Sequence, residues 1–164
     1  NSERKMDSME KELMKTQDLN TLYIEKGKQL SEKLSEVEKQ LEEASLQRKT
    51  LKIVEFRNSP LFRRLTRQDT VSQYKLTDEE WQGLEFAVDD IYDHFTSRLM
   101  ALTNMSITEL RICYLIKLNI PVSDIALLLN KSAGAISHAR GRLWKDITGE
   151  QPSACKMDNY LKTM

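Results

Sequence analysis

Apolar residues recur at alternating steps of three and four along the first third of the chain. With Met6 at position a of a heptad, ten of the fourteen a and d positions up to Leu51 are apolar or Tyr, and no Pro interrupts them. A hydrophobic period of about 3.5 residues is typical of a left-handed coiled coil. We therefore expect one long coiled-coil helix over residues 1–57.

The most regular part of this pattern supplies a candidate dimerisation seam. In a parallel pair of helices, Lys33 at position g would face Glu38 at position e of the partner helix, which is an attractive pairing. The alternative is a long helix that folds back on its own domain. We favour the homodimer, because a lone amphipathic helix would expose its apolar stripe. The predicted dimerisation residues are Leu30, Leu34, Val37, Leu41, Ala44 and Leu51.

Residues 58–105 are expected to form a connecting helical segment. Ser59 followed by Pro60 predicts a helix start, because Ser caps helix N-termini and Pro is favoured at the first helical position. This short helix should run through Leu65, and a polar loop should follow over residues 66–75.

A second helix start follows at Thr77. Glu80 lies three residues further on, which is the spacing of a capping box. Apolar residues then recur at helical steps, so the pattern predicts one amphipathic helix of roughly 25 residues. Its apolar side consists of Trp81, Leu84, Val88, Ile91, Phe95, Leu99 and Leu102.

Residues 106–164 show the spacing of a helix-turn-helix followed by one further helix. Asn119 stands where the first helix needs a left-handed end, a conformation that Asn tolerates, and Ser132 is placed to cap the third helix. Gly149 should end that helix, and Ser153 should begin a last helix that covers part of the core. The third helix, to residue 147, is expected to bury Ile136, Ala139, Leu143 and Ile147.

The remaining side of the third helix carries the candidate chemistry. It combines glycines and short polar side chains with cations, and no acid occurs from residue 131 to residue 145. Glycine allows close approach, Ser and His can bond to base edges, and Lys and Arg neutralise phosphates. The predicted DNA-binding residues are Lys131, Ser132, Gly134, Ser137, His138, Arg140, Gly141, Arg142 and Lys145. Of these, Gly134, Ser137, His138, Gly141, Arg142 and Lys145 are expected to face outward, and Arg140 is expected to contact phosphate.

Charge changes this picture in one respect, because the formal net charge is zero and any attraction to nucleic acid must be local. Residues 48–67 hold seven Lys or Arg against one acid, Glu55, whereas residues 76–95 hold seven acids and no Lys or Arg. Two interpretations stay open. The two segments pack near each other in one domain, or the basic segment contacts DNA or an acidic membrane surface.

Neither catalytic nor metal-binding patterns stand out. The two cysteines, Cys113 and Cys155, form no CxxC, and neither histidine lies at ligand spacing from them. We expect Cys113 to pack as a small apolar residue in a reduced, cytoplasmic protein. The sequence also lacks a phosphate-cradling glycine loop and a nucleophile motif. We therefore expect no enzyme activity, no cofactor, no metal and no small-molecule substrate.

The segment from Leu118 to Leu143 resembles the C-terminal DNA-binding domain of LuxR-type regulators. The shared pattern is a turn, then Ile-Ala and a Leu, then Ser with a small residue, a β-branched residue and a basic tail. More closely, the region from about Ser59 to Leu161 resembles regulators typical of Bacteroides-type bacteria. In those, tetratricopeptide repeats and a membrane segment precede a coiled coil and this domain.

This resemblance implies a four-helix domain, sequence-specific duplex DNA binding and dimerisation. It also implies an upstream sensor or membrane segment in the full-length protein. By position, the base-contacting residues of the family fall on Ser137, His138 and Gly141. The sequence departs from the family pattern at Asn119, Pro121, Lys131, Ala135 and Ala139, which leaves open which bases are read.

Two hypotheses of different classes follow. The first is a homodimeric DNA-binding transcriptional regulator of all-α fold. The second is a helical signalling adaptor that docks a protein partner and does not bind DNA. A sigma-like promoter-recognition module would need a polymerase-binding region, which the sequence does not display.

Overall fold

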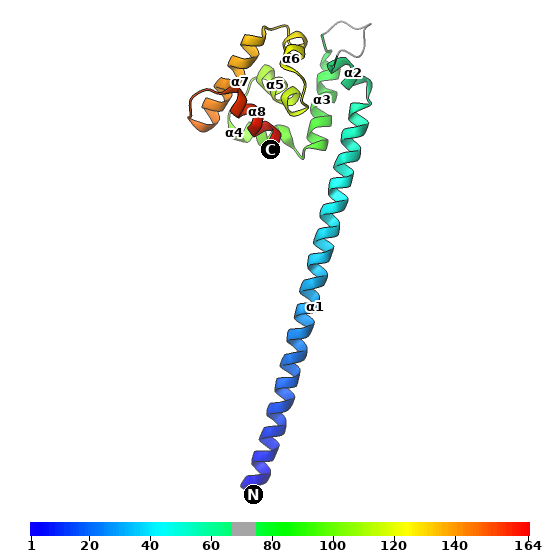
Figure 1. The fold of residues 1–164 in the computed structure, drawn as a ribbon, viewed down its shortest axis with the longest axis vertical. Coiled ribbons are helices and arrows are strands. Elements are labelled where there is room, and N and C mark those ends of the chain that lie inside the picture. Colours follow the sequence, from blue (N-terminus) through cyan, green and yellow to red (C-terminus); the bar gives the residue numbers. More distant parts are fainter. Residues whose placement is uncertain (67–74) are drawn as a thin grey trace. The chain divides into compact units, whose positions relative to one another are not determined.

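A computed structural model describes residues 1–66 and 75–164 of the chain, and within them every regular element is a helix (Figure 1). The expected all-α class is therefore confirmed. None of these helices is both long enough and apolar enough to span a bilayer. The helices are α1 (Ser2–Arg57), α2 (Pro60–Leu65), α3 (Asp78–Ile91), α4 (Phe95–Leu102), α5 (Ile107–Lys117), α6 (Val122–Leu128), α7 (Ala133–Thr148) and α8 (Ala154–Thr163).

The chain divides into two compact units, Asn1–Arg48 and Lys49–Met164. The first unit consists of the N-terminal part of α1, and this confirms the expected long helix. All its side chains are exposed, including those of Leu30, Leu34 and Leu41, which are 60%, 63% and 65% exposed. Pairing of this seam with a second copy stays a prediction. In the second unit, the segments expected as a connector and as a DNA-binding domain pack into one body.

The predicted start of α2 is confirmed in detail. Ser59 is the N-cap, its Oγ accepts a hydrogen bond from the Phe62 amide at 3.2 Å, and Pro60 is the first helical residue. The polar loop expected after this helix lies largely outside the described residues, as does Arg67.

The expectation of one continuous helix from Thr77 to Leu102 is wrong. The capping box of Thr77 and Glu80 is present, but α3 ends at Ile91 and α4 begins at Phe95. Between these two helices, Asp93 and His94 take left-handed φ values of 51° and 53°, a conformation that Asp and His adopt more readily than most residues.

Side-chain hydrogen bonds hold this break. The Asp89 carboxylate accepts from the amide of Thr96 at 2.7 Å and from its hydroxyl at 2.8 Å, so it caps the start of α4. The Arg98 guanidinium donates to the carbonyls of Tyr92 and Asp93. These hydrogen bonds connect α3 and the bend to α4. The apolar spacing that suggested a single helix gives no sign of them.

Helix α5 is the centre of the second unit. Every residue from Ile112 to Leu118 is buried, and α3, α6, α7 and α8 pack against this helix (Figure 1). Cys113 is fully buried within it, as expected, and burial raises the pKa of its thiol to about 12. A helix that is apolar on every side requires partners on every side, so α5 fixes where its neighbours lie.

Lys117 is the exception in this apolar surrounding, because its side chain is charged and only 6% exposed. Its ammonium donates to the carbonyls of Leu161, Lys162 and Met164 at 2.9, 3.2 and 2.9 Å. These carbonyls lie at the C-terminal end of α8, where the helix dipole favours a cation.

Two aromatic rings complete the surroundings of this ammonium. The centroids of the Tyr92 and Phe95 rings lie 4.6 and 5.5 Å from the Lys117 Nζ atom. Burial lowers the pKa of Lys117 to about 8, and the nearby charges of Lys49 and Arg98 act in the same direction. The three carbonyls and both ring faces favour the charged form, so the group is an ammonium at pH 7.

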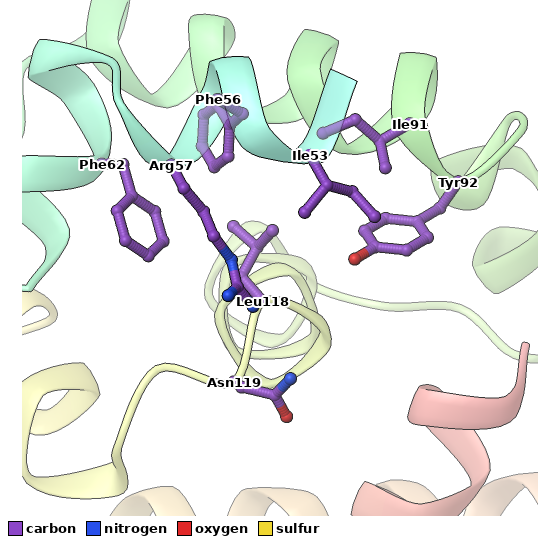
Figure 2. A pocket seen from close by; sticks show the side chains of 8 residues that line it. All are labelled: Ile53, Phe56, Arg57, Phe62, Ile91, Tyr92, Leu118 and Asn119. Carbon is purple, nitrogen blue, oxygen red and sulfur yellow. The ribbon is translucent and has the colours of Figure 1, made fainter. Parts of the chain in front are cut away.

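The end of α1, residues 49–57, belongs to the second unit and packs within it through apolar contacts. Figure 2 shows Phe56 and Phe62 near the Arg57 side chain, with Leu118 below them. The Phe56 and Phe62 rings meet edge to face, with centroids 5.7 Å apart. The hollow between these residues leaves about 10 Å³, room for one water at most, so it is a helix-packing seam and not a ligand cavity.

The basic and acidic segments do pack together. The Lys52 ammonium lies 2.9 Å from the Asp90 carboxylate, and Arg64 forms an ion pair with Glu80. The first of the two interpretations is therefore confirmed for these residues. The cations of the basic segment, Lys52 and Arg64, neutralise the carboxylates of Asp90 and Glu80 on α3.

Replacing Lys117 with Met should lower the stability of the protein. The variant keeps the apolar stem but leaves the carbonyls at the end of α8 without their donor, at a cost of about 2 kcal/mol. Urea unfolding followed by circular dichroism measures this loss. The exposed Lys162 serves as the control, since its replacement with Met should change stability by only a few tenths of a kcal/mol. Equal stabilities of the two variants would contradict the role assigned to Lys117.

Candidate nucleic-acid interface

Helices α6 and α7 and the turn between them form the predicted helix-turn-helix. Asn119 and Asn130 take the left-handed conformation at the ends of α5 and α6, with φ of 59° and 52°. Ser132 caps α7 by accepting a hydrogen bond from the Ala135 amide at 3.0 Å, and Gly149 ends α7 with φ of 73°. The turn residues and caps predicted from the sequence are all confirmed.

One side of α7 carries an exposed group of residues that we call the basic face. No acid occurs among residues 131–145, and in the described part of the chain none of the three Lys and Arg side chains of this face forms an ion pair or a hydrogen bond. The basic face consists of Lys131, Ser132, Gly134, His138, Arg142 and Lys145.

Gly134 lies on the basic face without a packing reason for its small size. A Cβ atom placed there would meet only the Ser132 Oγ, at 3.9 Å. An Ala would therefore fit and would favour the helix by about 1 kcal/mol. The absence of a side chain instead leaves the α7 backbone open to close approach from outside.

Gly141 corrects one expectation. The sequence placed it outward, but it is buried against the turn before α8. A Cβ atom at this position would lie 3.4 Å from the Pro152 Cβ and 3.6 Å from the Ser153 amide nitrogen. This side of α7 packs against the start of α8 and leaves no surface for a base.

Arg140 corrects a second expectation. It was predicted to contact phosphate, but it is only 6% exposed and its Nη1 lies 2.5 Å from the Asp158 carboxylate of α8. Its Nη2 donates to the Ser137 Oγ at 3.1 Å, which leaves Ser137 half-buried beside it. The guanidinium is therefore committed inside the protein because α8 covers this side of α7.

Sequence reasoning missed the residues that flank the basic face. A groove of about 340 Å³ lies between the start of α5 and α7. Ser106 and Thr108 contribute hydroxyls from the α5 side, and Glu109 contributes its carboxylate. From the α7 side, Lys131, His138 and Arg142 line the same groove. Two cationic side chains of the basic face, those of Lys131 and Arg142, thus border a concave surface that only the tertiary structure reveals.

In the described ranges, 1–66 and 75–164, no group of three or more His, Cys, Asp or Glu side chains could hold a metal ion. The chain matches no protein-family model, no curated protein and no solved structure.

The two arginines of α7 should respond differently to replacement by Ala. Arg140→Ala leaves the Asp158 carboxylate without its buried partner and should lower stability by about 3 kcal/mol. Arg142→Ala removes an exposed side chain and should change stability by less than about 0.5 kcal/mol. Thermal or urea unfolding of the two variants measures the difference. An Arg140→Ala protein as stable as the wild type would show that the ion pair with Asp158 is not formed in solution.

Proposed function

We propose that this chain is a DNA-binding transcriptional regulator in which α7 enters the major groove of duplex DNA. The observation that carries the proposal is the basic face: cations without ion-pair partners surround a backbone left open at Gly134. A DNA major groove is about 12 Å wide and admits an α-helix between two rows of phosphates. In such a groove, α7 would present polar side chains to the bases and cations to both sugar-phosphate walls.

The roles follow from reach and charge. His138 is exposed near the N-terminal end of α7, where helix-turn-helix proteins contact base edges. Arg142 and Lys145 lie one and two turns further along the same side, where long cationic side chains can bond to phosphates. Lys131 in the turn before α7 adds a further cation. Work on chromosomal DNA also suits the cytoplasmic location expected for a bacterial regulator.

Homodimerisation through α1 is the second part of the proposal. Leu30, Leu34 and Leu41 are each at least 60% exposed, so no described residue buries these side chains. In a parallel dimer, two g-to-e pairs would join opposite charges: Lys33 with Glu38, and Lys5 with Glu10. Two-fold symmetry of the protein would match the two-fold symmetry of a palindromic DNA site.

Binding to duplex DNA should weaken steeply as salt rises. Fluorescence anisotropy with a labelled mixed-sequence duplex, measured over a range of KCl concentrations, gives the slope of log K against log salt. Each phosphate contact contributes about 0.9 to that slope. Replacing Arg142 and Lys145 with Ala together should reduce the slope by about two, because two contacts are lost.

A control with the same charge change should leave this slope unaltered. Arg63 and Lys75 are exposed and lie outside the helix-turn-helix, so their joint replacement with Ala removes two charges elsewhere in the unit. Equal losses in both double variants would mean that net charge, and not the basic face, governs binding. Binding that does not depend on salt would contradict phosphate contact altogether.

Oligomeric state tests the second part independently of DNA. Replacing Leu34 with Asp puts a charge into the proposed seam and should weaken the dimer at least tenfold, because the carboxylate must be buried or the seam opened. Ser35→Asp adds the same charge one position outside the seam and should leave the dimer intact. Sedimentation equilibrium measures both. A wild-type chain that sediments as a monomer at micromolar concentration would rule out this dimer.

A specific observation favours the adaptor as a second candidate. A groove of about 320 Å³ between α3 and α5 is lined by apolar side chains such as Trp81 and by the acids Asp78 and Glu85. Ile107 lines it and is 68% exposed, while Phe86 on α3 is 74% exposed. An adaptor would dock its protein partner there. It would lose that partner when Phe86 and Ile107 become Ala and keep it when Arg142 and Lys145 become Ala.

A further inference from the structure

A continuous chain of polar contacts runs from α8 to the side of α7. Asp158 on α8 holds the Arg140 Nη1 at 2.5 Å, and the Arg140 Nη2 donates to the Ser137 Oγ at 3.1 Å. Arg140 is 6% exposed, while Asp158 and Ser137 are half-buried, so both bonds are partly shielded from water. Ser137 is followed in the sequence by the exposed His138 of the basic face. The contacts therefore fix a hydroxyl at the edge of the basic face.

Stability alone is a weak reason for this arrangement. The Arg140 Nε and the Asp158 Oδ1 are buried and have no hydrogen-bond partner in the described part of the chain. A buried ion pair with unsatisfied atoms is often no more stabilising than an apolar pair of the same size. Buried polar groups without hydrogen-bond partners call for an explanation other than stability. The Ser137 hydroxyl beside Arg140 supplies one.

The Ser137 hydroxyl is left as a donor. Serine and threonine side chains in a helix commonly donate to the carbonyl four residues earlier, as Thr148 does to Trp144 at 2.7 Å. Ser137 makes no such bond among the described residues, and its oxygen instead accepts from Arg140. With a lone pair engaged by the guanidinium, the proton of this hydroxyl is directed away from Arg140.

We propose that Ser137 is a base-reading residue that donates a hydrogen bond, and that Arg140 and Asp158 are its positioning residues. The inference rests on the proposed function and deepens it by naming the chemistry of one recognised base. The partner must offer an acceptor in the major groove: the N7 of a purine, the O6 of guanine or the O4 of thymine. Cytosine offers only a donor there and is disfavoured.

Selection from a randomised duplex pool, followed by sequencing of the bound fraction, tests this inference with the full chain. Ser137→Ala removes the hydroxyl. Arg140→Met with Asp158→Leu replaces the buried ion pair by apolar side chains, which proteins often tolerate without loss of stability, and it keeps the hydroxyl but frees it. Glu150→Gln is the matched control, because it alters the hydrogen bond from the Trp144 Nε1 on α7 without touching Ser137.

Both variants should lose preference at the same single base position, by about tenfold, which is the size of one lost base contact. The control should keep every preference. The salt slope should stay that of the wild type in all three proteins, since no phosphate contact is removed. A merely structural role of Arg140 would weaken binding at all positions alike and would not single out the position read by Ser137.

Several results would overturn the inference. A double variant that retains the preference lost by Ser137→Ala shows that the hydroxyl needs no positioning. A salt slope reduced by about one in the double variant shows that Arg140 contacts a phosphate. Selection by the wild type that Ser137→Ala leaves unchanged removes Ser137 from recognition while the proposed function stands, whereas a wild type that enriches no sequence overturns both.

Should the double variant fail to fold, as judged by circular dichroism, Asp158→Asn takes its place. The amide oxygen can still accept from Arg140, but the charge that holds the guanidinium is gone. A partial loss of preference at the Ser137 position is then expected. An unchanged preference at that position again overturns the inference.

Discussion

The burial of the C-terminal part of α5 on every side is the constraint on which the second unit depends. Residues from Ile112 to Leu118 leave no face of this part of the helix for water, so its neighbours must cover it completely. The one charge inside this surrounding, on Lys117, is accommodated only because the C-terminal carbonyls of α8 surround its ammonium. The same contact that satisfies the lysine therefore fixes the last turn of α8 against α5, and the position of α8 follows from the sequence of a helix more than 40 residues earlier.

Helix α8 then determines which side of α7 remains available. In α8, Met157 and Leu161 belong to the core. Asp158 and the turn that begins at Pro152 cover Arg140 and Gly141. The exposed residues of α7 are those on the side away from α8. The sequence of α8 suggests little more than that this helix covers part of the core. Its position nevertheless determines which residues of α7 can form the candidate interface.

The sequence could predict the features that depend on residues close together along the chain. The caps at Ser59, Thr77 and Ser132 involve atoms three residues apart, and each was recognisable from residue type and spacing alone. The break between α3 and α4 was not, because the apolar spacing continues through it and the stabilising bonds of Asp89 and Arg98 depend on the bend itself. The burial of Arg140 was hidden for a different reason: its partner lies eighteen residues further along the chain, on another helix.

The distribution of compensated charge makes a net charge of zero compatible with the polyanionic ligand proposed above. Some cations outside the helix-turn-helix are neutralised internally: Lys52 by Asp90 and Arg64 by Glu80. The Lys and Arg side chains of the basic face have no such partners in the described part of the chain. Two of them, Lys131 and Arg142, line a groove in which Glu109 is the only acid among the described residues. The field outside the protein is set by uncompensated charges, because paired opposite charges cancel within a few ångströms and salt screens the remainder. A chain with equal numbers of acids and bases can therefore present a locally positive surface. A duplex would respond to the charge of the basic face and not to the net charge of the protein.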